Sequence, residues 1–420
     1  MNTLTQYFSA DTQNYHGILD ERFHDLAVHF SRLQDARTDQ GGAALAVYFG
    51  TQKVVDIFTG KKSRDELWDA NTLSVSYSTG KGVLATLAHI LVSEGYLEYD
   101  RPIAYYWPEF AQQNKQKISL RDVLSHQSGL YDIRNTIQDA SEMLDWPHML
   151  EVFESTAPRF TATHAQAYQA LTFGWLVGGV LEKATGATLP DLMQKYLVEP
   201  LKLDGAYFGV PVSELSRVAR LIAPVKSVEK VGTPIHKTSH QQKKTSVMDK
   251  LVTWTGQNPQ DFQDAMMPKG MRHFSFFSDE GLQAVIPAAN GAFTANSLSK
   301  MYAMLANQGC FEDKTLIKPA VFKQLSTIQS FSRDKVMPIP MHWRLGYHRV
   351  ITLGKRAKHG FGHIGYNGSG AWCDPERNLS FAYVHNFKIG SITGDYRLWS
   401  LTQETLRCAD LFLKGKKGWF

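Results

Sequence analysis

Two residues in the first fifth of the chain have the types and spacing needed for nucleophilic catalysis. Ser78 and Lys81 stand three positions apart in Ser78-Thr79-Gly80-Lys81-Gly82, so a helix would place both side chains on one face. A serine hydroxyl becomes an effective nucleophile when a neighbouring base takes its proton. A lysine can act as that base when burial lowers the pKa of its amine. Taken alone, the pair also fits a helix-capping serine and a surface lysine.

The spacing Ser-x-x-Lys occurs four times, beginning at Ser78, Ser227, Ser297 and Ser332. Ser227 and Ser332 lie in polar segments without a helical pattern. Ser297 opens an amphipathic segment, where a serine suits an N-terminal cap. Ser78 alone follows a strand-rich region and opens an apolar helix through small residues, which let a substrate approach the backbone. Context therefore favours Ser78 as the nucleophile.

The elements around Ser78 follow from hydrophobic spacing. Apolar residues recur every three or four positions from Ser78 to Glu94, and Gly95 stands where such a helix would end. Residues 43–49 and 54–58, separated by a turn at Gly50, predict a β-hairpin. Before them, residues 18–33 have a helical spacing that should cover one face of the sheet.

The rest of the chain predicts helices in the middle and strands near the C-terminal end. Helical patterns occupy residues 119–125, 146–153, 175–185, 298–307 and 398–412, and strand-like segments occupy 343–351, 369–373 and 379–385. We therefore predict an α/β fold with one antiparallel sheet built from residues 17–77 and 285–420 and flanked by helices. Residues 78–284 should form a mostly helical portion of the same unit, with polar loops and short helices at 222–283. The active site is expected where the two portions meet.

Composition limits the possible partners and the cellular compartment of the protein. The 420 residues carry 45 Lys and Arg against 40 Asp and Glu, a weakly basic balance that does not favour nucleic acid. No apolar run approaches the roughly 20 residues that cross a bilayer, and Met1 to Gly17 lack a secretory pattern. The three cysteines are widely separated, which is typical of reduced thiols. We expect a cytoplasmic protein without a membrane or nucleic-acid partner, and the oligomeric state is left open.

The sequence lacks the signatures of other catalytic classes. It contains no Gly-x-Ser-x-Gly, His-Glu-x-x-His, phosphate loop or dinucleotide fingerprint. His236 and His240 are spaced for one helix face, but no further metal ligands lie nearby in the sequence. We expect neither a cofactor nor a metal.

Further motifs follow Ser78 in a fixed order, and together they are far more specific than one tetrapeptide. They are Glu94-Gly95-Tyr96-Leu97, Trp107-Pro108-Glu109-Phe110, Leu120-Arg121-Asp122-Val123-Leu124-Ser125-His126-Gln127-Ser128-Gly129-Leu130, Tyr168-Gln169-Ala170, Pro287-Ala288-Ala289-Asn290-Gly291, Phe361-Gly362-His363-Ile364-Gly365 and Asp374-Pro375. Over about residues 17–390 the chain resembles the class C β-lactamase superfamily, especially its family VIII carboxylesterases.

The resemblance implies a β-lactamase-like fold and a role for each matching residue. Ser78 would be the nucleophile and Lys81 its partner. Tyr168 of the second motif, as a phenolate or as a phenol sharing a proton with lysine, would act as general base and later return the proton to the leaving group. The backbone N–H groups of Ser78 and Tyr366 would form the oxyanion hole. His363 and Gly365 stand in the third motif and would contact the substrate.

Two departures from the lactamase pattern bear on the substrate. The second motif has Ala170 where lactamases carry an asparagine that grips an amide. The third motif has His363 where they carry lysine, which weakens attraction for a β-lactam carboxylate. Both changes favour a serine hydrolase that cleaves carboxylic esters through an acyl-enzyme on Ser78.

Alternatives remain open at this point. The same residues would serve a β-lactamase or a D-amino-acid peptidase, and the fold could belong to a non-catalytic binding protein. Tyr168 could instead be a core tyrosine. His126 is interpreted as a residue that holds the fold together, because lysine and tyrosine already fill the role of base. The acyl and alcohol groups of the ester are not specified by the sequence.

Overall fold

The computed structural model describes residues 14–35, 41–161, 165–222, 257–352, 357–388 and 395–417. Residues 223–256 lie outside this description, and with them Ser227 and the pair His236 and His240. Of the predicted polar stretch 222–283, the described part contains two short helices, α10 (Pro259–Met266) and α11 (Asp279–Gln283).

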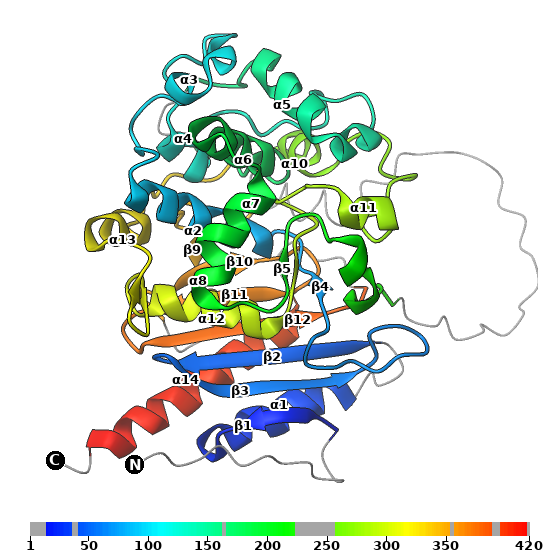
Figure 1. Cartoon of the computed structure of the whole chain (residues 1–420), viewed down its shortest axis with the longest axis vertical. Coiled ribbons are helices and arrows are strands. Elements are labelled where there is room, and N and C mark those ends of the chain that lie inside the picture. The colour runs from blue at the N-terminus through cyan, green and yellow to red at the C-terminus, as the bar shows by residue number, and fades with distance from the viewer. Residues whose placement is uncertain are drawn as a thin grey trace, which may run out of the picture.

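One antiparallel sheet unites the two ends of the chain (Figure 1). The N-terminal hairpin joins the C-terminal strands because β2 pairs along its length with β12. This confirms the predicted α/β fold class with its antiparallel sheet. In spatial order the strands are β1 (His16–Leu19), β3 (Gln52–Gly60), β2 (Gly42–Phe49), β12 (Leu379–His385), β11 (Gly370–Asp374), β10 (Phe361–Ile364) and β9 (His348–Arg349).

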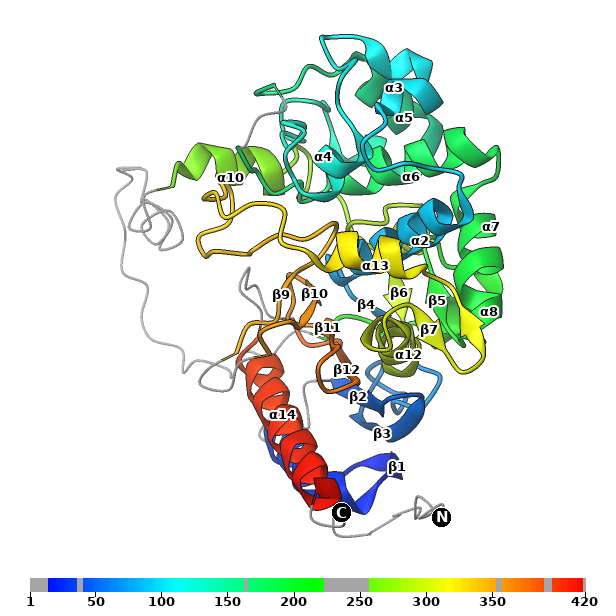
Figure 2. The same cartoon turned by 90° about the vertical axis from the view of Figure 1, so that its left-hand side faces the viewer.

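Alternation along the central strands gives the sheet two different faces. In β12, Leu379, Phe381 and Tyr383 point to one face, where α1 (His24–Asp35) and α14 (Tyr396–Lys417) pack. Ala382 and Val384 point to the other, against α12 (Ala295–Ala306). Alanine side chains such as Ala382 are small, so α12 lies close to this second face of the sheet. Figure 2 shows the course of α12 beside the sheet.

Helix α2 (Thr79–Glu94) runs between the sheet and the helical portion (Figure 1). All its residues except Val92 and Glu94 are buried, as a helix packed on every side requires. It ends at Gly95, whose left-handed φ of 87° costs glycine little. α2 is therefore a rigid, enclosed support for Ser78 at its start.

The helical portion covers α2 on the side away from the sheet (Figure 2). The predicted helices at 119–125, 146–153 and 175–185 correspond to α4, α5 and α6. This portion contains α3 (Ile103–Tyr106), η2 (Pro108–Ala111), α4 (Leu120–Leu124), η3 (Ala140–Leu144), α5 (Trp146–Ser155), α6 (Thr172–Thr185), α7 (Leu189–Met193), η4 (Gln194–Val198), α8 (Glu199–Leu201) and η5 (Val212–Arg217). The boundaries proposed between the two portions, at 77/78 and 284/285, stay a prediction.

Short elements link these layers. A three-stranded sheet leads into α2, and a hairpin and one helix follow α12. They are β4 (Ser74–Val75), β6 (Ala292–Phe293), β5 (Ala206–Tyr207), β7 (Cys310–Phe311), β8 (Lys314–Thr315) and α13 (Pro319–Ser326).

Three local expectations were wrong. Residues 16–19 form β1 on the edge of the sheet, and Asp20 caps the turn η1 (Glu21–Phe23), so the first α-helix begins at His24 rather than near 18. Thr294, not Ser297, caps α12. Within 343–351 only His348 and Arg349 form a strand. In each case pairing or capping with a distant or neighbouring residue overrides the local pattern.

Phe381 tests the packing between the sheet and α14. It is fully buried and stacked on Trp372 with ring centroids 5.2 Å apart. Phe381→Ala should lower the free energy of unfolding by about 3–5 kcal/mol because it leaves a cavity. Chemical denaturation measures this, with Phe331→Ala as the control because Phe331 is 78% exposed. Equal stabilities of the two variants would contradict the described packing.

Candidate active site

Ser78 stands at the start of α2, but its hydroxyl does not cap the helix. The preceding residue, Tyr77, has a φ of 46°, an uncommon conformation for a residue with a side chain. This turn carries the chain from β4 directly into α2. The Ser78 side chain is therefore free to interact with groups outside the helix.

The structure brings Ser78, Lys81 and Tyr168 together. Lys81 Nζ lies 2.9 Å from Ser78 Oγ, and the Tyr168 hydroxyl donates to the same oxygen at 2.8 Å. Lys81 also donates to the backbone carbonyls of Ala170 at 2.6 Å and Ala288 at 3.0 Å. One hydroxyl is thus in contact with both an amine and a phenol, as nucleophile activation requires.

Burial sets the charge state of Lys81. The side chain is fully buried, and within the described residues no carboxylate forms an ion pair with it. Burial holds the pKa of Lys81 well below its ordinary value of 10.5. Desolvation favours the neutral amine because no opposite charge compensates the ammonium.

Asp334 and Trp343 hold Tyr168 in place. Asp334 Oδ1 accepts the Tyr168 backbone N–H at 3.1 Å, and its Oδ2 accepts the Trp343 Nε1–H at 2.8 Å. The Trp343 ring stacks on the Tyr168 ring, with an interplanar angle of 9° and a centroid distance of 5.4 Å. Asp334 also accepts the N–H groups of Val336 and Met337. One buried carboxylate thereby joins Tyr168, Trp343 and the loop that follows.

Tyr168 is held as a protonated phenol. Burial raises its pKa, the hydrogen bond with Ser78 lowers it, and the Asp334 charge raises it, with a net upward shift. The phenol therefore keeps its proton at neutral pH.

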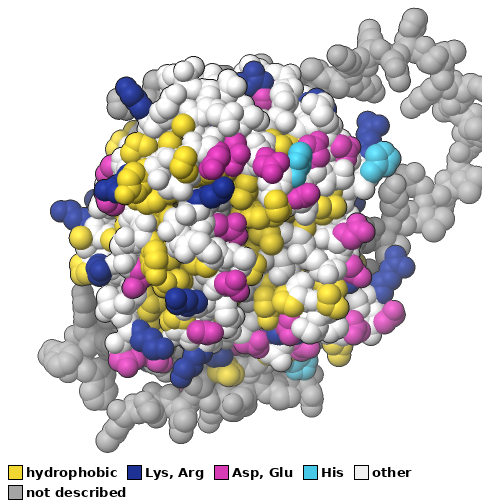
Figure 3. Space-filling view, turned by 45° about the horizontal axis from the view of Figure 1, so that its top comes forward, with side chains coloured by type: hydrophobic (Ala, Val, Ile, Leu, Met, Phe, Trp, Pro, Cys, Tyr) yellow, Lys and Arg dark blue, Asp and Glu magenta, His cyan; other side chains and the backbone are white. Residues whose placement is uncertain are grey.

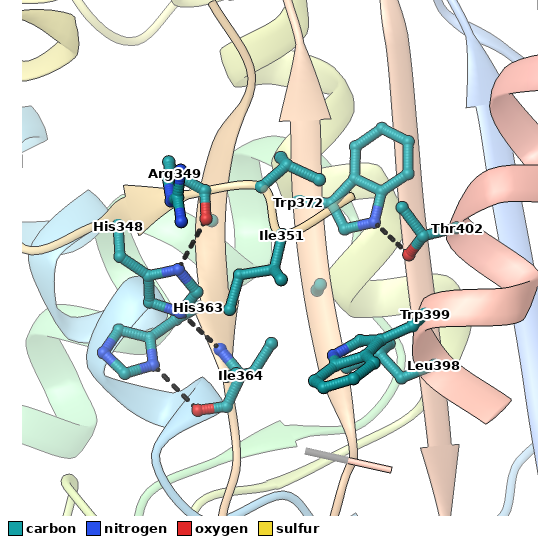
Figure 4. Close-up of a pocket in the computed structure, with 12 residues that line it drawn as sticks. His348, Arg349, Ile351, His363, Ile364, Trp372, Leu398, Trp399 and Thr402 are labelled. Atoms are coloured by element: carbon teal, nitrogen blue, oxygen red, sulfur yellow. Dashed lines mark hydrogen bonds between the residues drawn. The ribbon is translucent and has the colours of Figure 1, made fainter. Parts of the chain in front are cut away.

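His363 lies beside Tyr168, with ring centroids 6.2 Å apart, and His348 lies beside His363 (Figure 4). His348 Nδ1 lies 2.7 Å from the Arg349 carbonyl oxygen, and its Nε2 accepts the Ile364 N–H at 3.0 Å. His363 Nδ1 lies 3.0 Å from the Ile364 carbonyl oxygen, which places its proton on Nδ1 and leaves Nε2 as an acceptor. Burial lowers the pKa of His363 well below its ordinary range and that of His348 to about 4. Neither ring adds positive charge at neutral pH.

The cavity drawn in Figure 4 lies between the sheet and α14. It is lined by residues that include Trp372, Leu398 and Trp399, and its volume is about 10 Å³. That space accommodates about one water molecule. Ser78 is not among the residues that line it, so this cavity is not the substrate site.

The chain after β10 closes on the turn that carries Ser78. A Cβ at Gly365 would collide with the carbonyl oxygen of Ser76 and approach Thr79 Oγ1 to 3.3 Å. Glycine is required there because the two backbones touch. The next residue is Tyr366. Within the described part of the chain, neither the Ser78 nor the Tyr366 N–H has an intramolecular acceptor.

His126 lies behind Tyr168. It is fully buried, its Nδ1 accepts the Gln169 N–H at 3.3 Å, and its ring centroid is 4.2 Å from that of Trp343. Burial lowers the pKa of His126 well below its ordinary range. This packing fits the interpretation of His126 as a residue that supports the fold.

Sequence reasoning identified Ser78, Lys81 and Tyr168 but missed the groups that hold them. Ala288 appears in a quoted motif without a role, yet its carbonyl accepts from Lys81. Asp334 lies inside the Ser-x-x-Lys stretch at Ser332 that was set aside as polar. A single acidic residue in a polar loop carries no local signal of burial, so only tertiary structure reveals it.

Charges on the outer surface are mixed. Figure 3 shows one face on which acidic and basic side chains are interspersed. Among the described residues, no helix combines the length and the apolar character needed to cross a bilayer. Nor do these residues bring together three His, Cys, Asp or Glu side chains in an arrangement suited to a metal ion.

An antiparallel sheet with a buried serine-bearing helix and a lysine and tyrosine on the serine hydroxyl defines a serine hydrolase of the β-lactamase type. The sequence profile of the Beta-lactamase family matches residues 30–400, and the chain belongs to this family. The resemblance stated from the motifs is thereby confirmed.

Relatives of two kinds are similar over nearly the whole chain. "Esterase/beta-lactamase LipL" of Mycobacterium tuberculosis is 33% identical over 380 residues, which are 88% of this chain and 82% of that protein. A penicillin-binding protein homolog from Caulobacter crescentus has a TM-score of 0.78 and 29% identity, covering 94% of this chain and 99% of the other. A family VIII carboxylesterase has a TM-score of 0.80 and 25% identity with the same coverage.

The pH dependence of hydrolysis tests the state of Lys81. A proton acceptor must be uncharged, so the rate should fall as pH drops through the lowered pKa of Lys81 and stay level above it. The profile of kcat/KM for p-nitrophenyl butyrate, corrected for spontaneous hydrolysis, measures this. A rate that keeps rising until the pH nears 10.5 would show an ordinary lysine.

Asp334→Asn tests the support of Tyr168. The amide replaces one acceptor oxygen by a donor, so at least one buried N–H loses its partner, at a cost of about 1–3 kcal/mol. We expect lower thermal stability and a fall in kcat larger than any change in KM, because Tyr168 is displaced from Ser78. Asp313→Asn, on an exposed residue, is the matched control. If Asp334→Asn behaved like this control, Asp334 would have no positioning role.

Proposed function

We propose that this hydrolase cleaves carboxylic esters of neutral acids through an acyl-enzyme on Ser78. The observation that carries the proposal is the contact of Ser78 Oγ with both Lys81 Nζ and the Tyr168 hydroxyl. The esterase names of LipL and of the family VIII carboxylesterase support the ester as substrate.

The hydrogen bonds of Lys81 indicate the direction of proton transfer. A neutral amine has two N–H donors and one lone pair. The two donors are used by the carbonyls of Ala170 and Ala288, so the lone pair is left for the Ser78 hydroxyl. Lys81 therefore takes the Ser78 proton as Oγ attacks the ester carbonyl.

Tyr168 then protonates the leaving group. As a protonated phenol it gives its proton to the departing alkoxide when the carbonyl–oxygen bond breaks, and it regains a proton from the Lys81 ammonium. Water then attacks the acyl-enzyme by the same transfers in reverse. Tyr168 passes its proton to Lys81 and takes one from the water, and the Lys81 ammonium returns a proton to Ser78 Oγ as the acid leaves. The net reaction is ester and water to acid and alcohol, with the protein unchanged.

The developing oxyanion needs two donors, and the N–H groups of Ser78 and Tyr366 are the candidates. Each such donor contributes about 3 kcal/mol to the transition state. Gly365 allows the backbone before Tyr366 to touch the turn at Ser76, two residues before the nucleophile, and this contact supports the pairing of the two N–H groups.

Two features favour a neutral ester over a β-lactam. Ala170 offers no side-chain amide to bind the substrate's amide. His363, the proposed substrate contact of the third motif, is neutral because burial lowers its pKa, so it attracts a carboxylate weakly. Gly365 would present only backbone to the substrate.

A β-lactam substrate is the second candidate, because LipL carries both activities in its name. Turnover of nitrocefin compared with p-nitrophenyl butyrate separates the two. We expect the ester to have the higher kcat/KM, and the reverse order would favour the β-lactam.

Ser78→Ala tests the nucleophile. It should abolish p-nitrophenyl butyrate hydrolysis and labelling by a fluorophosphonate probe while the circular dichroism spectrum is unchanged, because only the attacking oxygen is lost. Ser332→Ala is a matched control, since Ser332 has the same Ser-x-x-Lys spacing but is exposed. Undiminished hydrolysis by Ser78→Ala would refute the assignment, and an unlabelled wild-type protein would favour a non-catalytic binding role.

A further inference from the structure

Four aromatic side chains cluster beside the proposed nucleophile. The Tyr77 ring lies at the centre of this aromatic cluster. Its centroid is 6.0 Å from that of Tyr366 and 6.3 Å from those of Phe276 and Phe277, with interplanar angles of 60–80°. The members come from three separate segments, so the arrangement is produced by the fold and not by sequence proximity.

Two members of the aromatic cluster are fixed by the backbone of the site itself. Tyr77 precedes Ser78 and keeps a φ of 46°. Such a conformation is strained for a non-glycine residue, and residues of this kind cluster at functional sites. Tyr366 follows Gly365, whose backbone touches the turn at Ser76. Both rings are therefore held close to Ser78, where the carbonyl group of the ester would bind.

The aromatic cluster is accessible to a ligand. Tyr366 is 42% exposed, and Tyr77, Phe276 and Phe277 are partly buried. Phe274 supports Phe276 from behind, with ring centroids 4.9 Å apart. Exposed apolar surface costs free energy in water, so a contiguous apolar patch beside a polar site indicates a binding surface.

Arg220 and Asp279 compensate each other's charge beside the aromatic cluster. Arg220 donates to the Phe277 carbonyl at 2.8 Å and pairs with Asp279 at 3.1 Å. Lys81 is held neutral by burial. A neutral, flat apolar group therefore suits this surface better than an anion or a cation.

We propose that Tyr77, Phe276, Phe277 and Tyr366 bind an aryl group of the substrate ester. The inference rests on the proposed function, because the cluster is useful only if Ser78 reacts with an ester. An aryl group can lie edge-to-face against rings already tilted in this way. The aryl group belongs to the acyl half or to the alcohol half of the ester, and the experiment has one arm for each.

The experiment compares three esters by pH-stat: ethyl acetate as reference, ethyl phenylacetate for the acyl half and benzyl acetate for the alcohol half. The readout is the ratio of kcat/KM for each aryl ester to that for ethyl acetate. In the wild type at least one ratio should be well above one. Phe276→Ala should lower that ratio roughly tenfold, since one buried aromatic contact is lost.

Tyr77→Gly is the second variant, and it keeps the inference testable if Phe276→Ala fails to fold. Glycine adopts the φ of 46° without strain, so the turn is kept while the ring is removed. The same ratio should fall. Phe331→Ala is the control, because Phe331 is 78% exposed and is not a member of the aromatic cluster.

The outcomes separate this inference from the proposed function. A lowered ratio in either arm supports the inference and identifies the half of the ester that is bound. Unchanged ratios in both folded variants, in an enzyme whose Ser78 is labelled by a fluorophosphonate probe, overturn the inference and leave the esterase proposal standing. A wild-type enzyme that is neither labelled nor active on any ester overturns both.

Discussion

The uncharged amine of Lys81 is the interaction on which the proposed chemistry depends. Its two donors are directed to the carbonyls of Ala170 and Ala288, and its third neighbour is the Ser78 hydroxyl. All three partners are neutral, so no charge offsets the desolvation of an ammonium. A carboxylate in the place of either carbonyl would restore the charge and remove the base.

The fold serves to maintain this environment. α2 is enclosed on all sides, so Lys81 has no access to solvent. Asp334 and Trp343 hold Tyr168 in place. Burial lowers the pKa of His363, so this imidazole adds no positive charge at neutral pH. Of the two described side chains that contact the Ser78 hydroxyl, Lys81 is held neutral by burial and Tyr168 keeps its proton, which is consistent with a neutral substrate and with the aryl-binding role proposed for the aromatic cluster.

Much of the fold and of the candidate site is predictable from the sequence, through local residue spacing and through resemblance. Local signals define α2, because the apolar spacing and Gly95 act within one helix, and they define the hairpin of β2 and β3. The role of Tyr168 comes from resemblance, since its contact with Ser78 spans 90 positions. Asp334 and the edge strand β1 escaped prediction because long-range partners decide them. The catalytic roles of these residues stay predictions until they are measured.

The most direct test of the account is the ionisation of Lys81 itself. Heteronuclear NMR of protein labelled in lysine follows the Lys81 side-chain resonance through a pH titration, with the resonance assigned by its absence in Lys81→Met. We expect a titration midpoint well below 10.5, or an amine that stays neutral throughout the pH range in which the protein is folded. A midpoint at or above 10.5 would contradict it, because Lys81 could not then accept the proton of Ser78.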